Sequence, residues 1–585
     1  MSSALSKLLL LGLAVTSTLA DVTFNVVGFP EGDGTSLAVS VNNQLTKLST
    51  TPETYPLWSG TVAGAKAPLK YHYAIVDGSS AVVDAEKFER DHAEGDKSKN
   101  DFFSRPLTVT KLPEVPPSYD PWPFTRPAMF DEGKIGTFHL TADPEQVKGI
   151  HGGGIDNDAP DIKVDMTYVH PDFSIALKNV SWGISGQSTR AFAKQSYKLK
   201  FKDSGKFLTT GSIKLRAEES DPTMMREKVY LDLLNSLGVP AIQANWARLF
   251  VNKQPVGLFL MTDDIKTPYI KRAYHAGNDK AKTGPEFKCN ALEVTNEASL
   301  AYKGEDIASY DFKGIYEIEE APDGEDVNKK DLIAFTKAIN DFNPEKADSA
   351  ALTKFAEVWD HQTFLRAMAL EFLAGSWDTF WVAASNYYLY KPPGKPWNYI
   401  PTDFDYTFGN DYPTSQLGTY QEFSGGKSRP PLDKLLAVPS VRKDFEEMLK
   451  TITNRVFNSE ILDARIDAYL AMIKDELSWD RQLTRLAPGK SRNWTVDSAV
   501  QNVAGAVPTM PFGLKPWIAE RVKLLQTQLN YQQKLEKYTS KVNGNSTTVG
   551  AEGSDNNKKP DASSSAAKVA SSVLLLALSL AAASL

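Results

Sequence analysis

Acidic and amide side chains set among aromatic residues carry the strongest chemical signal in this sequence of 585 residues. Asp378 and Asn386 lie between tryptophan, phenylalanine and tyrosine residues, and Asp403 and Asp405 follow at a spacing of i, i+2. Burying a carboxylate without a partner is costly, so these flanks argue against ordinary turn or capping aspartates. If residues 403–405 form a strand, both carboxylates point the same way. Carboxylate oxygens and substrate phosphate are ligands that suit Mg²⁺, so this segment predicts a magnesium site.

Alternation in the stretch that ends at Phe201 predicts a strand with two lysines on one face. Tyr197, Leu199 and Phe201 alternate with Lys198 and Lys200, so the three apolar side chains are expected to face a core. The two ammonium groups then share the other face, where they could hold phosphate groups as point charges. A solvated strand face is the alternative interpretation.

A helix is predicted to begin at Asp221, which is a good N-cap, with Pro222 in its first turn and a stop at Gly238. Arg226 and Glu227 lie to one side of its apolar stripe. Glu227 is expected to pair with one of the strand lysines and to orient it. An ordinary amphipathic surface helix fits the same periodicity.

The residues before position 106 are predicted to form a separate all-β unit. Residues 22–27, 37–41 and 71–76 alternate between polar and apolar side chains, and turns rich in Gly, Asp and Asn separate them. Strands at this spacing are typical of a small β-sandwich, which we predict at 21–105. A structural or spacer role is favoured over polysaccharide binding.

The rest of the mature chain is predicted to be one large domain. A stiff, Pro-rich linker is expected at 106–134 and an α+β domain at 135–540. Strand patterns dominate this domain to about residue 265, and helical patterns dominate at 330–375 and 430–540. The predicted fold class is therefore α+β.

Both ends of the chain have the pattern of targeting signals. Residues 1–20 combine a lysine, a short apolar run and small residues before a cleavage point, which is typical of a signal peptide. At the other end, a low-complexity stalk at 541–568 precedes an apolar tail at 569–585. This pattern predicts a GPI anchor attached at Ser563 or Ser564, and the alternative is a tail-anchored helix. Together the two signals predict a eukaryotic secretory protein on the outer cell surface.

Composition narrows the function classes further. The formal net charge of −7 argues against a protein that binds nucleic acid through phosphate contacts. Cys289 is the single cysteine, which excludes an internal disulfide and a Cys-rich zinc site. The sequence contains no complete P-loop, no nucleophile elbow and no His-Glu-x-x-His motif. N-glycosylation sequons at Asn179, Asn493 and Asn545 agree with a secretory route.

Five motifs appear in the same order as in a known family. The sequence resembles the CotH family, which comprises spore coat protein H of spore-forming bacteria and GPI-anchored relatives in the fungal Mucorales. The motifs are Ser-Tyr-Lys-Leu-Lys-Phe201; Lys-Leu-Arg216 with Asp221 and Arg226-Glu227; Arg248-Leu-Phe-Val-Asn252; Trp377-Asp378 with Asn386-Tyr-Tyr-Leu-Tyr; and Asp403-Phe-Asp405 with Phe-Gly409.

The resemblance implies an atypical, two-lobed protein-kinase-like domain after the small β-sandwich, using ATP and Mg²⁺ or Mn²⁺ to phosphorylate protein hydroxyls. In this comparison Asp378 fits the catalytic aspartate. Asn386, Asp403 and Asp405 fit the metal-binding residues.

The resemblance also assigns the basic residues. Lys198 or Lys200 fits the phosphate-binding lysine, Glu227 fits its catalytic partner, and Arg226 is a further candidate for nucleotide binding. The familiar kinase motifs Gly-x-Gly-x-x-Gly, His-Arg-Asp and Ala-Pro-Glu are missing from this chain.

Two functions follow from the resemblance. The first is an extracytoplasmic kinase whose substrate is a protein of the secretory route or cell wall. The second is a GPI-anchored adhesin, invasin, or spore or wall coat protein that binds a host-cell receptor or wall partner. Residues 387–395 look like a kinase-type strand and turn, whereas fungal invasins carry a polar, charged stretch there, which favours catalysis.

Overall fold

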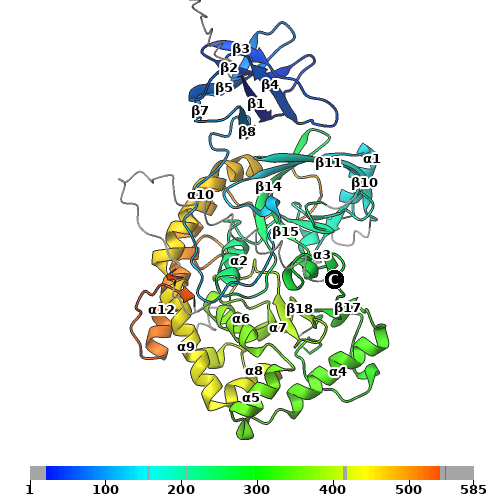
Figure 1. The fold of residues 1–585 in the computed structure, drawn as a ribbon, viewed down its shortest axis with the longest axis vertical. Helices are drawn as coiled ribbons and strands as arrows, with labels where there is room; N and C mark the ends of the chain where they lie inside the picture. The colour runs from blue at the N-terminus through cyan, green and yellow to red at the C-terminus, as the bar shows by residue number, and fades with distance from the viewer. Residues whose placement is uncertain are drawn as a thin grey trace, which may run out of the picture.

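The computed structural model describes residues 21–153, 159–186, 188–204, 207–293, 295–412, 418–540 and 547–548. It is 31% helix and 25% strand, which confirms the predicted α+β class. Figure 1 shows a small β-unit in blue, a strand-rich middle and a helix-rich end, stacked along the long axis. The predicted signal peptide and apolar tail, with Asn545, Ser563 and Ser564, lie outside the described residues. None of the helices that the structure describes is long and apolar enough to cross a membrane.

The N-terminal β-unit contains the three strands predicted for it. Its strands are β1 Val22–Val27, β2 Ser36–Val41, β3 Gln44–Lys47, β4 Leu57–Val62, β5 Leu69–Val76, β6 Val82–Ala85, β7 Arg90–His92 and β8 Lys97–Phe102. One sheet has the order β4-β1-β8, and the other has the order β3-β2-β5-β6 with β7 paired to β5. The sheets share an apolar cluster that includes Phe24, Val39 and Tyr73, all fully buried.

Seven strands of the larger part close into a barrel. They are β9 Gly136–Thr141, β10 Ile162–His170, β11 Phe173–Ser185, β12 Ser196–Lys200, β13 Ser212–Arg216, β14 Ala244–Val251 and β15 Gln254–Asp263. Their order round the barrel is β10-β11-β12-β13-β15-β14-β9, and helix α1 (Pro144–His151) joins β9 to β10. Tyr197, Leu199 and Phe201 belong to the apolar cluster inside the barrel, as predicted, which leaves Lys198 and Lys200 on its outer face.

Helix α2 (Arg226–Ser236) confirms the predicted helix but begins later than expected. The carboxylate of Asp221 accepts hydrogen bonds from the backbone N–H groups of Met225 and Arg226, at 2.9 Å each, so it bonds the first turn from four residues before the N-cap position, which Met225 occupies. Gly238, with φ +60°, follows its end as predicted. The helix is buried along nearly its whole length, so the interpretation as a surface helix is wrong.

The remaining elements are mostly helical, as predicted for 330–375 and 430–540. The helices are α3 Thr267–Tyr274, α4 Glu325–Asp341, α5 Ser349–Ala356, α6 His361–Ala374, α7 Phe380–Ala383, α8 Pro430–Ala437, α9 Pro439–Arg455, α10 Ser459–Arg481, α11 Val496–Ala504 and α12 Leu514–Gln528. A sheet of order β17-β16-β18-β19 contains β16 Glu286–Cys289, β17 Tyr316–Glu320, β18 Tyr387–Tyr390 and β19 Asn398–Pro401. Short elements are η1 Ala128–Phe130, η3 Ser188–Ala191, η4 Ile307–Ser309, η5 Pro344–Lys346, η7 Tyr420–Glu422, β20 Thr539–Ser540 and β21 Thr547–Thr548.

Helix α6 is the centre of the helical part, where it contacts α2, α9, α12 and β19. Almost every side chain along it is buried, so it lacks a solvent face. Gly375 ends it in the left-handed region with φ +62°, and a Cβ there would lie 2.3 Å from the ring of Trp517. Both constraints require glycine at this position, and the chain turns directly into the segment that carries Asp378.

The β-unit packs against the barrel through a buried junction. The ring of Phe102, at the end of β8, stacks with that of Phe250 on β14 at a centroid distance of 6.3 Å. The guanidinium of Arg248 lies 4.1 Å from the Phe102 ring centroid and pairs with Glu476 of α10. Arg105 lies 3.5 Å from the same carboxylate. These contacts, and not the linker alone, fix the position of the β-unit.

Two buried histidines at this junction are expected to make the fold sensitive to acid. His139 lies 5.8 Å from the ring of Phe29, and the backbone oxygen of His170 accepts a hydrogen bond from Asn100. Burial lowers the pKa of each histidine to about 4. Because the unfolded chain binds a proton at a higher pH than the folded chain, stability falls as the pH drops from about 6.5 to about 4.

We expect His139→Phe to reduce this loss. A buried phenylalanine keeps the aromatic packing and removes a contribution of up to about 3 kcal/mol near pH 4. Thermal melts at pH 7.5 and pH 4.5 measure the difference, with His72→Phe on β5 as the control. A fall in melting temperature as large in His139→Phe as in the parent protein would show that this group does not control acid sensitivity.

Candidate active site

A cavity of about 430 Å³ lies between the outer face of the barrel and the segments around β18 and β19. All four predicted residues of the aromatic segment line it: Asp378, Asn386, Asp403 and Asp405. A second, smaller cavity adjoins it and shares Asn386 and Asp403. The structure therefore brings these four residues together, as the sequence predicted.

The hairpin of β18 and β19 positions two of these residues. Tyr387 pairs with Pro401, so the residues just outside the hairpin face each other, and the backbone N–H of Thr402 donates to Asn386 O at 2.9 Å. Asn386 and Asp403 both have positive φ, +57° and +65°. Left-handed backbone is unusual for aspartate and is held here by the surrounding structure, as is common at functional sites.

The expectation of a strand through 403–405 is wrong, because β19 ends at Pro401 and both aspartates lie in the loop that follows. Their carboxylates nevertheless face one partner. The guanidinium of Arg216 lies 2.5 Å from Asp403 Oδ1 and 3.5 Å from Asp405 Oδ1. The hydroxyl of Ser220 also donates to Asp405 Oδ2 at 2.5 Å. Side-chain contacts in the loop therefore direct both carboxylates toward Arg216, although the residues do not form a strand.

Asn386 holds Asp378. Its Nδ2 donates to the backbone oxygen of Asp378 at 2.8 Å and to Asp378 Oδ2 at 3.0 Å. Burial, with the charge of Asp403, raises the pKa of Asp378 to about 7. The carboxyl group is thus oriented at the cavity wall and is more basic than an exposed aspartate.

Arg216, the last residue of β13, is surrounded by carboxylates. Besides Asp403 and Asp405, its Nε lies 2.5 Å from Glu227 Oε2 and 2.9 Å from Glu218 Oε1. Burial raises the pKa of Glu227 and of Asp405 well above the usual range, whereas Arg216 lowers that of Asp403 against the effect of burial. Four carboxyl groups thus surround one guanidinium, and oxygen donors of this kind fit a hard divalent cation such as Mg²⁺.

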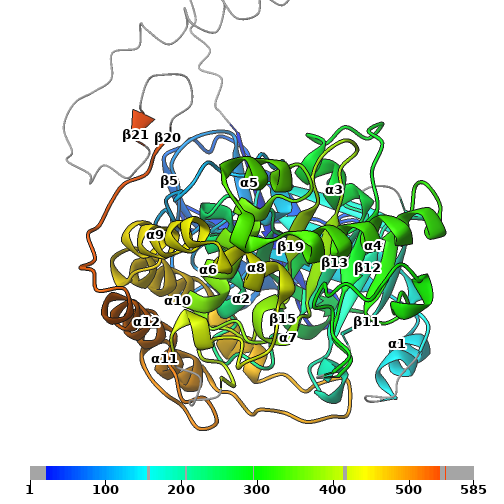
Figure 2. The same cartoon turned by 90° about the horizontal axis from the view of Figure 1, so that it is seen from below.

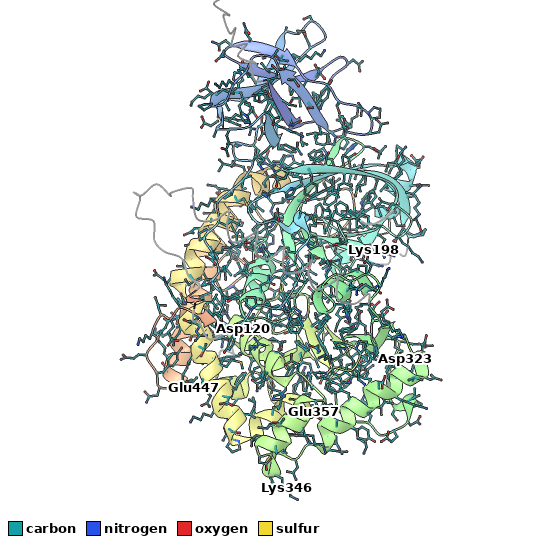
Figure 3. The ribbon with its side chains drawn as sticks, in the orientation of Figure 1. Asp120, Lys198, Asp323, Lys346, Glu357 and Glu447 are labelled. Carbon is teal, nitrogen blue, oxygen red and sulfur yellow. The ribbon has the colours of Figure 1, made fainter. Side chains whose placement is uncertain are left out.

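Lys198 and Lys200 do not line the cavity, so the prediction that they reach it is wrong. Their ammonium groups lie 3.5 Å and 3.0 Å from the carboxylate of Asp161. Lys198 pairs in register with Lys214 across β12 and β13, so the two side chains share one face of the sheet. Strand β12 also reaches the cavity through Ser196, but Lys198 pairs with Asp161 and is not part of the cavity wall. Figure 3 shows it on the barrel at the right of the view.

The basic residues that line the cavity are Lys214 and Arg216 on β13, together with Lys194 and Lys288. The signal for the first two was present in the sequence, because Lys214 and Arg216 alternate with buried apolar residues in the same way as Lys198 and Lys200. Lys194 could not be found this way, because it precedes β12. Burial lowers its pKa to about 8, and its ammonium lies 3.1 Å from Asp480 of α10.

The side chains of Glu227 and Arg226 point to different parts of the protein, and only that of Glu227 lies at a cavity. Glu227 lines the smaller cavity and pairs with a strand cation, but that cation is Arg216 and neither predicted lysine. Arg226 is fully buried, where it lies 2.5 Å from Asp221 and donates to the backbone oxygen of Phe512. The prediction that Arg226 binds a nucleotide is therefore wrong. One helical position separates the two side chains, which is enough to turn one toward the barrel and the other toward the helices.

A different group of described residues already has its possible ligand atoms within 4.8 Å of one another. It comprises Asp131, His170 and Asp172, outside the cavity. The ammonium of Lys134 lies 3.1 Å from Asp131 and 2.6 Å from Asp172, and that of Lys99 lies 2.5 Å from Asp172. Lysines thus already neutralise this group, and the cavity remains the better candidate for a divalent ion.

The cavity lies within the part of the chain that matches a known family. The sequence model of a family described as CotH kinase protein matches residues 183–504, which include every cavity residue named above. The chain is 28% identical to "Invasin CotH3" of Rhizopus delemar over 88% of this chain and 86% of the relative. It is 28% identical to "Spore coat protein homolog 1" of the same organism, over 90% and 84%. It is 22% identical to "Inner spore coat protein H" of Bacillus subtilis, over 59% and 89%.

Proposed function

The chain belongs to the CotH kinase protein family, and on that premise we propose that it is an atypical protein kinase. It transfers the γ-phosphoryl group of ATP to hydroxyl groups of a protein with the help of Mg²⁺ or Mn²⁺. The barrel and the helical part form its two lobes, and the cavity between them holds the nucleotide. The observation that carries the proposal is the convergence of Asp378, Asn386, Asp403 and Asp405 in one cavity with two strand cations.

Asp378 acts on the acceptor hydroxyl. Asn386 holds it at the cavity wall, so its carboxylate can accept the hydroxyl proton as the acceptor oxygen bonds to the γ-phosphorus and the bond to the β–γ bridging oxygen breaks. The side chains of Asn386, Asp403 and Asp405 supply the oxygen atoms that would hold the divalent ion. An ion bound there neutralises charge on the phosphates, which is the chemistry it supplies.

The Arg216–Glu227 pair, between a barrel strand and a helix, takes the place of the strand lysine and helix glutamate of familiar kinases. Arg216 already contacts four carboxylates, so Lys214, on the same strand face, is the better phosphate ligand. Its ammonium lies 3.1 Å from Asp264 and its side chain is 37% exposed, so it can turn toward a triphosphate. Lys194 adds a second positive charge, held by Asp480.

Lys214→Met is expected to weaken ATP binding about tenfold or more, since a charge-assisted contact contributes about 1.5–3 kcal/mol. Lys198→Met is the matched control, because it removes the same side chain from the paired position one strand away. Titration calorimetry with ATP and Mg²⁺ measures both. Equal dissociation constants for the two variants would exclude Lys214 as a phosphate ligand.

The proposed activity is tested on purified protein. The chain is incubated with γ-labelled ATP, Mg²⁺ or Mn²⁺ and a cell-wall or secretory protein fraction, and nucleotide binding is titrated with and without metal. We expect metal-dependent binding and labelled protein. If the protein transfers no phosphate, and Asp403→Ala leaves nucleotide binding unchanged, the proposal is wrong.

We further propose that the protein is carried by the secretory route to the cell, wall or spore surface. Support comes from the signal-peptide pattern at 1–20 and the GPI pattern before 569–585, with attachment at Ser563 or Ser564. In this scheme 21–105 is a β-sandwich domain and 135–540 is the catalytic domain. A phospholipase specific for phosphatidylinositol should release the protein from intact cells, and retention after that treatment would contradict the anchor.

A second candidate function is that of a surface adhesin on a kinase-like scaffold. The relatives named as invasins favour it, because they match over most of the chain. Cell binding that survives Asp378→Ala and Asp403→Ala would support adhesion independent of the cavity. Binding lost in both variants would count against it.

A further inference from the structure

The connection between α10 and α11 is tied to the barrel beside residues that line the cavity. The backbone N–H of Lys490 donates to Ala191 O at 2.8 Å, and that of Ala193 donates to Lys490 O at 2.9 Å. A Cβ at Gly489 would lie 2.7 Å from Ala191 O, so only glycine allows this approach. Phe192, between the paired residues, lines the cavity. Figure 2 shows the connection as a long orange loop running from the helices toward the barrel.

The same loop is tied to a second wall residue. Glu219 lines the cavity, and its Oε1 accepts a hydrogen bond from the backbone N–H of Arg492 at 3.0 Å. The indole N–H of Trp494 donates to the backbone oxygen of Glu219 at 2.9 Å. The guanidinium of Arg492 lies 6.0 Å from the ring centroid of Phe192. Residues on both sides of Asn493 are therefore fixed to the wall of the cavity.

Asn493 itself is exposed between these fixed neighbours and begins the sequon Asn493-Trp-Thr495. Its φ of +53° belongs to a left-handed turn, a conformation that asparagine tolerates. Neighbouring backbone and side-chain bonds anchor the loop, so a group attached to Asn493 stays close to the wall residues Phe192 and Glu219.

We propose that Asn493 carries an N-linked glycan at the mouth of the cavity, and that this glycan restricts the acceptor to hydroxyls on flexible or unfolded segments. The attachment rests on the secretory route, and the restriction rests on the kinase activity, both proposed above. A lipid-linked oligosaccharide diphosphate is the donor. Asn493 Nδ2 forms a bond to C1 of the first sugar and loses a proton, the bond from C1 to the phosphate oxygen breaks, and the lipid diphosphate leaves.

Occupancy is measured first, on full-length protein secreted by a eukaryotic host. A glycosidase that converts a glycosylated asparagine to aspartate marks each occupied sequon in peptide mass spectra. We expect the mark at Asn493, and its absence overturns the proposal. This measurement needs no phosphate transfer, so it tests the glycan at Asn493 independently of the kinase activity.

Access is measured with two acceptors, a short unstructured peptide and a folded protein that carries the same hydroxyl sequence. Asn493→Gln should lower KM for the folded acceptor about fivefold and leave KM for the peptide and for ATP unchanged. Asn179→Gln, which removes an exposed sequon on β11, is the matched control and should change none of them. Glycosidase-treated parent protein repeats the test without a substitution in the fold. Equal KM values for the folded acceptor in all forms would overturn the restriction.

Discussion

Asp403→Asn is expected to lower kcat for phosphate transfer by about two to three powers of ten while the protein stays folded. The substitution keeps the shape of the side chain and removes the charge that an ion between the cavity and the phosphates requires. Losing one preorganised electrostatic contact costs about 2.7–4 kcal/mol of transition-state stabilisation in other enzymes. Arg216 lowers the pKa of Asp403 despite its burial, so the carboxylate is charged at neutral pH in the parent protein.

The fold should tolerate this change because Arg216 keeps three other carboxylate partners. Phosphate transfer at saturating ATP and Mg²⁺ measures kcat, and thermal melting measures stability. Asp467→Asn is the control, because it removes an aspartate from an exposed pair with Lys515. A kcat within tenfold of the parent value would contradict the assignment of Asp403 to the metal site.

Local patterns in the sequence predicted the elements well. Alternation identified the inward-facing residues of β12, because a strand with one buried side must repeat every two residues. The family resemblance, and not alternation, predicted the strand directly after Asn386 that the structure shows as β18. The helix start at Asp221 was misplaced, because the same carboxylate can cap a turn or a helix and the sequence does not distinguish them.

The choice of cations was harder, because it depends on pairing between distant segments. Lys198 and Lys214 have the same pattern and share one face of the barrel, but Lys198 pairs with Asp161 whereas Lys214 lines the cavity, and no local pattern distinguishes them. Lys194 and Asp480 are far apart in the sequence, and no periodicity connects them. The carboxylate set, by contrast, was predictable because Asp378 to Asp405 is one short segment folded by a hairpin.

Helix α10 contacts both the junction with the β-unit and the cavity, and no local sequence pattern predicts this. Glu476 pairs with Arg248 at the junction with the β-unit, and Asp480, one turn later, holds Lys194 at the cavity. Residues four positions apart lie on one face of a helix, so a single face contacts both places. The β-unit is thus joined by buried charges to the helix that positions a cavity lysine.

Arg216→Met is expected to destabilise the protein by roughly 3–5 kcal/mol, the range for removing one partner of a buried ion pair. The side chains of Glu218 and Glu227 are almost fully buried, and Arg216 is the cation that lies beside both. Methionine fills much of the same volume, so the loss reports charge more than packing. The melting temperature of the variant should therefore fall well below that of the parent protein.

The effect of Mg²⁺ distinguishes a loss of positive charge in Arg216→Met from a simple packing defect. A divalent ion bound near Asp403 and Asp405 supplies positive charge that the variant lacks, so Mg²⁺ should raise the melting temperature of Arg216→Met more than that of the parent protein. Arg442→Met, at an exposed position on α9, is the control and should melt like the parent at every Mg²⁺ concentration. If Arg216→Met melts at the parent temperature without metal, the four carboxylates do not depend on this guanidinium. If it melts lower but Mg²⁺ has no larger effect on it, the carboxyl groups around position 216 do not form a cation site.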